Sequence, residues 1–151
     1  MVIDDLDRHL PAAGSIERAV VPMAMYLAWC VNLQLLDSDF QSDHEGQLLR
    51  LRYREISPAE FLTTTCGGHF SSALLNPEGQ RFTDGYYQDY LRDFAATFGT
   101  TLEGVYAVND DWATYDQIAR VLTRRIMASK SASRSGNYAE KGRRKWWQVW
   151  R

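Results

Sequence analysis

The longest stretch of the chain without a charged side chain, residues 19–36, most constrains the fold. Its eighteen residues reach the lower limit of length for a helix that crosses a bilayer. Pro22 lies near its start, Asn32 and Gln34 lie near its end, and no basic cluster flanks it as in membrane helices. A helix that is apolar nearly all round is otherwise one that other elements cover on every side. We therefore predict a central core helix here and no membrane span.

Two helices are predicted from the residue types at their ends. The sequence Ser57-Pro58-Ala59-Glu60 has the form of a capping box with proline in the first helical position, and Gly67-Gly68 is a typical helix end. Thr83 is the expected cap of a later helix over residues 84–98, in which apolar residues recur at spacings of three and four.

A further amphipathic helix is predicted from Trp112 to about Ile126, with Asn109 or Asp110 as its cap. Its apolar stripe, like that of the helix over 84–98, needs a surface to pack against. The central core helix can supply that surface.

The segment Leu49–Arg54 is ambiguous, because its strict alternation is typical of a half-buried strand. We favour a helix over about residues 44–54, since only residues 105–108 offer a second extended segment to pair with it. The predicted fold is all-α, mainly helical with at most one minimal two-stranded ribbon. Its form is a compact bundle of about five helices around a central apolar helix, with a flexible basic C-terminal tail.

Charge and composition divide the chain into three parts. Residues 1–129 hold ten basic and eighteen acidic residues, a net charge of −8, and form the predicted helical globular domain. Residues 130–144 are rich in serine and basic side chains and cannot bury enough apolar surface to order themselves, so we predict a flexible basic linker. Residues 145–151 form a tryptophan-rich C-terminal motif.

The segment Asp4–His9 gathers three carboxylates and an imidazole. A metal ion or acid–base catalysis would need further groups from elsewhere, and nothing in the sequence marks them. We expect a solvated end that docks Leu6 and Leu10 onto the core. His44 and His69 stand without a nucleophile or cysteine at the spacing of a triad or zinc site. We therefore predict no catalytic residue, no metal site, no cofactor and no enzymatic activity.

Acidic side chains gather in two parts of the domain and indicate binding to a basic protein partner. The same charge repels phosphates, so we predict no nucleic-acid binding through the body, although Tyr53 lies among three arginines at positions 50, 52 and 54. The residues predicted to contact the partner are Asp37, Asp39, Asp43, Glu45, Asp110, Asp111 and Asp116.

The C-terminal motif contains three of the five tryptophans of the chain. Indole rings beside cationic groups suit a pocket on another protein or a membrane interface, since each ring has an apolar body and a polar N–H. Docking on the acidic surface of the chain itself and binding to nucleic acid remain open. The predicted docking residues are Lys145, Trp146, Trp147 and Trp150.

Cys30 and Cys66 are the only cysteines, and their spacing fits neither a zinc knuckle nor a redox pair. We expect both to be reduced and buried. The first residues are acidic where a secretory signal is basic, and no apolar region follows at once. The expected location is therefore the cytoplasm.

Several blocks rich in aromatic residues follow one another along the chain: Asp4-Asp5 with His9, Met25–Trp29, Ser57–Leu62, Phe82–Phe94 and Val105–Asp116. Over about residues 4–126 these blocks resemble those of a group of uncharacterised bacterial proteins. These proteins are often encoded near secreted polymorphic toxins, and the resemblance implies an immunity protein. They tend to carry tryptophan where this chain has Arg8 and a second histidine where it has Pro22, so a site formed by those histidines would be incomplete here.

The function predicted from these features is that of an immunity-type protein that binds and neutralises a cognate bacterial toxin or effector in the cytosol. One alternative is an adaptor or scaffold that uses the tryptophan-rich tail to dock on a protein or membrane surface. A second alternative is a small hydrolase that uses the Asp4–His9 segment. A deep cleft in which histidine and carboxylate side chains meet at bonding distance would favour the hydrolase.

Overall fold

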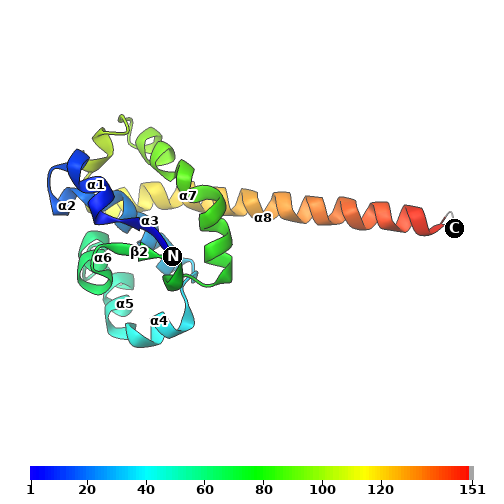
Figure 1. The fold of residues 1–151 in the computed structure, drawn as a ribbon, viewed down its shortest axis with the longest axis horizontal. Coiled ribbons are helices and arrows are strands. Elements are labelled where there is room, and N and C mark those ends of the chain that lie inside the picture. The colour runs from blue at the N-terminus through cyan, green and yellow to red at the C-terminus, as the bar shows by residue number, and fades with distance from the viewer. Residues whose placement is uncertain (150–151) are drawn as a thin grey trace. The chain divides into compact units, whose positions relative to one another are not determined.

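The fold is almost entirely helical. The computed structural model describes the backbone of residues 1–149 and the side chains of residues 1–134. Over these residues there are eight α-helices, more than the five expected, because several are short. The elements are β1 (Val2–Asp5), α1 (Leu6–Ala13), α2 (Ile16–Ala19), α3 (Val21–Asn32), α4 (Ser38–Asp43), α5 (Glu45–Arg52), α6 (Pro58–Cys66), β2 (His69–Ser71), the 3-10 helix η1 (Ser72–Leu74), α7 (Pro77–Thr97), the 3-10 helix η2 (Gly104–Ala107) and α8 (Trp112–Val149) (Figure 1).

The chain divides into two units, Met1–Val121 and Leu122–Arg151. The first unit contains every element up to the start of α8 and carries the core. The described part of the second unit is the remainder of α8, up to Val149, which includes residues 130–144. The flexibility of that stretch and the domain boundary at residue 129 stay predictions.

Helix α3 is the centre of the first unit. Every side chain from Val21 to Val31 is buried, and α3 packs against α2, α5, α6 and α7. Tyr26 and Trp29 are fully covered and lie in a cluster of tilted and edge-to-face rings. This confirms the central core helix. No helix within the described part of the chain has the length and apolar character needed to cross a membrane.

The predicted ends of α6 are confirmed. The Ser57 side chain accepts a hydrogen bond from the backbone N–H of Glu60, and Gly67 ends the helix in the left-handed conformation. Both cysteines are free thiols as expected, but only Cys30 is fully buried, whereas Cys66, the last residue of α6, is half-buried. Burial raises the pKa of Cys66 to about 12.

The predicted start of α7 is wrong. The helix begins at Pro77, and the side chain of Asn76 caps it by accepting from the N–H of Gly79. Thr83 lies buried inside the helix, 2.8 Å from the hydroxyl of Tyr26. The Asn76-Pro77 pair is the stronger start signal, and a tertiary hydrogen bond satisfies the hydroxyl that would otherwise favour a cap position.

A two-stranded ribbon is present, but between other residues than those expected. β1 and β2 pair in antiparallel fashion, with Asp4 opposite Phe70 and an irregularity between Val2 and Asp4. Residues 104–107 form η2 instead of a strand, while the favoured helix near residues 44–54 is present as α5. The two short strands lack a regular alternation, so the sequence pattern did not reveal them.

The cap of α8 lies one residue later than expected. Asp111 accepts from the N–H of Thr114, whereas Asp110 accepts from the N–H of Ala59 in α6. Within the first unit, Tyr115 and Ile118 of α8 are buried. A contact between distant helices thus removed the Asp110 side chain from the cap position.

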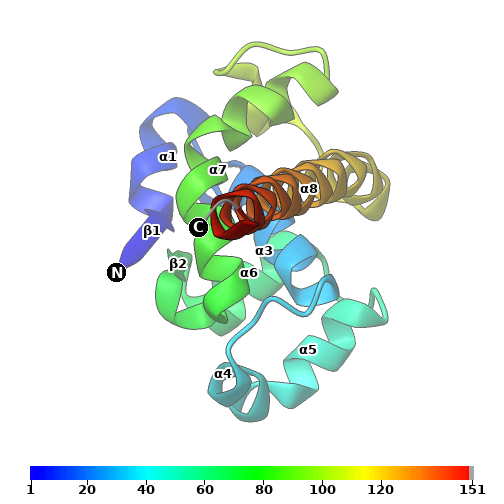
Figure 2. The same ribbon diagram turned by 90° about the vertical axis from the view of Figure 1, so that its right-hand side faces the viewer.

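Helices α4 and α5 follow one another at one end of the first unit, away from α1 (Figure 2). The Asp37 side chain caps α4 by accepting from the N–H groups of Asp39 and Phe40. Helix α5 buries Leu48 and Leu51 toward the core. The opposite face of α5 is left for solvent or for a partner.

Candidate functional site

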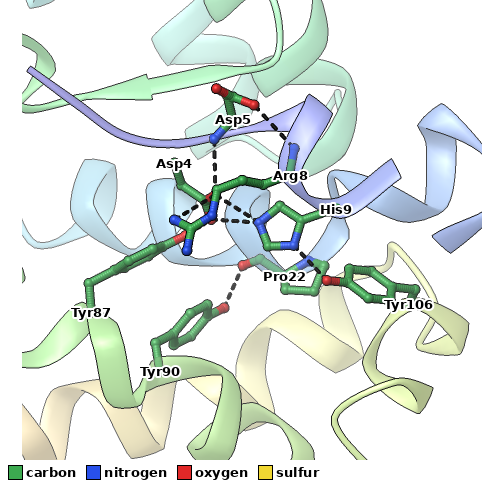
Figure 3. A network of polar contacts seen from close by, with 8 residues as sticks. All are labelled: Asp4, Asp5, Arg8, His9, Pro22, Tyr87, Tyr90 and Tyr106. Carbon is green, nitrogen blue, oxygen red and sulfur yellow. Dashed lines mark hydrogen bonds and ion pairs between the residues drawn. The ribbon is translucent and has the colours of Figure 1, made fainter. Parts of the chain in front are cut away.

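A buried network of polar side chains is centred on His9. The Nε2 atom of His9 lies 2.8 and 2.7 Å from the two carboxylate oxygens of Asp4, and Nδ1 lies 2.6 Å from the Tyr106 hydroxyl (Figure 3). The Tyr87 hydroxyl donates to Asp4 at 2.5 Å. Asp4 is 3% exposed and His9 5% exposed. The network therefore lies inside the fold.

Local structure brings Asp4 and His9 together. Asp4 lies in β1, and the side chain of Asp5 caps α1 by accepting from the N–H of Arg8. The chain turns from strand to helix at this cap, so that His9, one turn into α1, faces back toward Asp4 (Figure 3). Asp5 also donates its backbone N–H to the Asp4 carboxylate at 2.9 Å. Sequence proximity and one cap thus build the pair.

Two tyrosines from distant elements complete the network. Tyr87 comes from α7 and Tyr106 from η2. Burial, with the charge of Asp4 adding to it, raises the pKa of Tyr87 well above its ordinary value, and burial also raises the pKa of Tyr106. Both therefore keep their hydroxyl protons near neutral pH. The Tyr90 hydroxyl nearby donates to the carbonyl oxygen of Pro22 at 2.5 Å.

Both nitrogens of the His9 ring are engaged. With the Asp4 carboxylate accepting from Nε2–H, Nδ1 of a neutral ring accepts from the Tyr106 hydroxyl. A general base or a metal ligand needs a ring nitrogen that can reach the substrate or the ion. Histidine and carboxylate thus meet at bonding distance, but in a closed network. This arrangement stabilises the junction of β1, α1, α7 and η2.

The expectation for the N-terminal segment is therefore wrong in one respect. Leu6 and Leu10 are only partly covered, whereas Asp4 and His9 are buried. The segment docks through hydrogen bonds because Tyr87 and Tyr106 supply partners for its polar groups. Within the described residues no group of three or more His, Cys, Asp or Glu side chains is placed to hold a metal ion.

Four of the seven predicted partner-binding acids have intramolecular roles. Asp37, Asp110 and Asp111 accept hydrogen bonds from backbone N–H groups at helix starts. Asp116 pairs with Arg54 at 2.7 Å, and this hydrogen bond lowers the pKa of Asp116. Contact of these four with a partner stays a prediction.

The other three acids, Asp39, Asp43 and Glu45, are exposed on α4 and the first turn of α5. Among the described residues, the carboxylate groups of these three acids form no ion pair and accept no hydrogen bond. Of the three, Glu45 lines a pocket of about 260 Å³ between the two helices, here called the α4–α5 pocket. Its lining residues are Gln41, Ser42, Glu45, Leu48, Leu49 and Arg52.

Two leucines of α5 lie among the mainly polar lining residues of the α4–α5 pocket. Leu48 is buried, whereas Leu49 is 45% exposed. Sequence reasoning identified Glu45 but missed Leu49 and Arg52. The signal was available in the alternation of residues 49–54, which places apolar and cationic side chains next to one another on α5.

Arg54 lies at the surface in a cluster with Trp112 and Asp116. Its guanidinium lies 4.7 Å from the centroid of the Trp112 ring and donates two hydrogen bonds to Asp116, at 2.7 and 3.3 Å. The hydrogen bond to Asp116 raises the pKa of Arg54. Next to it, Tyr53 is 74% exposed. The charge of Arg54 is thus already matched within the fold.

The predicted docking residues of the tail fall outside the described side chains. Lys145, Trp146 and Trp147 lie where only the backbone is described, and Trp150 lies beyond it. Docking of the tail on a protein, on a membrane surface or on the chain itself therefore stays a prediction.

Comparison with known proteins gives one match. A family model described as "Domain of unknown function (DUF7832)" matches residues 2–108. No curated protein and no solved structure matches the chain. The matched region contains the His9 network and the α4–α5 pocket. Because this region spans most of the chain, the protein belongs to the DUF7832 family of uncharacterised proteins.

Proposed function

We propose that this protein is an immunity-type inhibitor that binds a cognate bacterial toxin or effector and covers its active surface. One observation carries the proposal. The carboxylates of Asp39, Asp43 and Glu45 are exposed on α4 and at the start of α5 without a partner among the described side chains, and Glu45 lines a pocket together with the exposed Leu49. Protein interfaces commonly combine apolar side chains with surrounding polar and charged ones.

The charge of the domain supports a basic partner. Residues 1–129 carry a net charge of −8. Acidic surfaces speed association with basic proteins and disfavour acidic ones. A toxin with a basic active surface, such as a nuclease, has the complementary charge.

The arrangement of the fold also suits inhibition. A stable complex buries on the order of 1,600 Å² in total, and a surface that is rigid before binding loses less entropy on association. Helix α5 packs against the buried helix α3 and against α6, and α4 packs against α5. The surface of α4 and α5 therefore rests on a well-packed support.

The first test identifies the partner. The full chain is purified from its native host at low salt, and any protein recovered at near-stoichiometric ratio is identified and expressed alone to measure its toxicity. We expect a basic protein whose toxicity is relieved by co-expression of this chain. Recovery of the chain alone, or of a partner whose toxicity is unchanged by it, contradicts the proposal.

The second test concerns the surface. The triple variant Asp39→Lys, Asp43→Lys and Glu45→Lys should weaken binding of that partner by at least about tenfold, since reversed charges repel it. A matched control changes three exposed acids outside α4 and α5, with the same change in net charge: Glu17→Lys, Asp84→Lys and Glu103→Lys. An equal loss of binding in both variants would assign the effect to net charge and not to this surface.

Deletion of residues 130–151 separates the inhibitor from the adaptor. An inhibitor that acts through α4 and α5 keeps its protection after the deletion. Loss of activity together with the tail would favour an adaptor that docks through its tryptophans.

A further inference from the structure

Two opposite charges line the α4–α5 pocket without pairing. Glu45 and Arg52 both line it and lie seven residues apart on α5, which is two turns, or about 10 Å along the helix axis. Neither forms an ion pair with the other or with another described side chain. Other arginines at this end of the unit do pair, Arg50 with Glu55 and Arg54 with Asp116.

Between these charges the pocket is partly apolar. Leu48 forms its buried part, and Leu49 stands 45% exposed. On the α4 side, Gln41 donates its amide N–H to the carbonyl oxygen of Leu36 at 3.0 Å, which holds that side chain in place. An occupant therefore meets an anionic group, an apolar centre and a cationic group along a single helix.

We propose that the α4–α5 pocket binds a short segment of a protein partner that carries a basic side chain, an apolar side chain and an acidic side chain in this order along α5. The basic group pairs with Glu45, the apolar group packs on Leu49, and the acidic group pairs with Arg52. An extended chain covers 10 Å in about three residues, so the two charged residues of the segment lie about three positions apart. This inference rests on the proposed function and names its recognition element.

The two charges set the direction of the segment. In the matching orientation, each charge of the pocket gains an opposite partner at a site that becomes sheltered from water. In the reversed orientation, two like-charge contacts form, and such contacts are strongly unfavourable in an interface. The pocket thus selects one polarity of the segment as well as its composition.

The experiment uses a displayed library of random peptides and the full chain. Peptides are selected for binding to the chain and counter-selected against the variant Glu45→Arg, Arg52→Glu, which keeps the net charge. We expect selected peptides to share a basic, an apolar and an acidic residue at fixed spacing. Absence of enriched peptides, or enrichment without this pattern, would overturn the inference.

Synthetic copies of the selected peptides are then measured against single variants. Glu45→Arg or Arg52→Glu should each weaken binding about tenfold, as expected for loss of a charge pair with repulsion added. The double variant should bind a peptide with its two charged residues exchanged and reject the original. Equal binding of both peptides by the chain and by the double variant contradicts the proposed polarity.

Two controls complete the design. Glu17→Arg and Arg81→Glu change exposed charges outside the pocket and should leave peptide binding within about twofold. Circular dichroism should show the same helicity for all variants, because both pocket charges lie at the surface. Peptide selection needs no toxin, so its outcome is independent of the neutralisation test. Selection can fail while the chain neutralises a toxin, and it can succeed while no toxin is neutralised. The two proposals are therefore tested separately.

Discussion

The Nε2 atom of His9 and a carboxylate oxygen of Asp4 lie 2.7 Å apart, inside the fold and only five residues apart in the chain. The pair stands at the contact of four elements, because Tyr87 of α7 donates to the same carboxylate and Tyr106 of η2 bonds the other nitrogen. A buried histidine–aspartate pair can act in catalysis or stabilise the fold. Because both ring nitrogens of His9 are hydrogen-bonded and the pair is buried, a role in stabilising the fold is favoured.

His9→Ala should lower the free energy of unfolding by roughly 3 kcal/mol, because it leaves a buried carboxylate without its main partner. Urea unfolding followed by circular dichroism measures the change. The exposed His69 is the control, and His69→Ala should change stability by less than about 0.5 kcal/mol. A His9→Ala variant as stable as the wild type would show that the network contributes little to the fold.

Two glycines of α7 should respond oppositely to alanine. A Cβ at Gly79 would lie 2.7 Å from the backbone oxygen of Leu35, whereas a Cβ at Gly85 meets no atom within 4 Å. Gly79→Ala should therefore destabilise the protein by more than about 1 kcal/mol, and Gly85→Ala should stabilise it by about 0.5–1 kcal/mol through helix propensity. Thermal unfolding of the two variants checks the signs. Two changes of the same sign would contradict this account of the approach of α7 to Leu35.

Gln34 and Arg54, two residues beyond the ends of α3 and α5, have the left-handed conformation, at φ of 58° and 59°. Glycine is preferred there. Gln34→Gly should stabilise the protein by up to about 1 kcal/mol, since it relieves the backbone. Arg54→Gly should stabilise less or destabilise, because it also removes the contacts with Asp116 and Trp112. Chemical unfolding of both variants measures the difference, and a larger gain for Arg54→Gly would mean that those contacts contribute nothing.

The ion pair between Arg54 and Asp116 should make a small contribution to the free energy of unfolding, and this contribution should depend on pH. The hydrogen bond from Arg54 lowers the pKa of Asp116 in the folded state, so the stabilisation is present above the unfolded carboxyl pKa and is lost as pH falls through the folded value. Because both side chains are nearly half exposed, we expect the pair to stabilise the folded state by less than about 1 kcal/mol. A double-mutant cycle with Arg54→Met and Asp116→Asn measures the coupling at pH 7 and again at about pH 2.5. Coupling that persists unchanged at the lower pH would indicate packing, not charge.

The helix ends show how far local signals reach. Ser57 and Gly67 were identified correctly because a cap depends on residues within one turn. Thr83 was misassigned because the Tyr26 hydroxyl, 57 residues away, satisfies it inside α7. A residue that suits a cap can thus lie in a helix interior when a distant group bonds it.

The charge-free stretch by itself determined the core, because an apolar helix must be buried by other elements of the fold to remove its side chains from water. The sequence likewise determined the acidic balance of residues 1–129. Only the tertiary structure decided which acids cap helices, that Asp116 pairs with Arg54, and that the unpaired carboxylate of Glu45 lines the α4–α5 pocket. It also decided that His9 bonds Tyr106, 97 residues away. Hydrogen bonds and ion pairs depend on distances of a few ångströms between side chains, and the order of residues along the chain does not contain those distances.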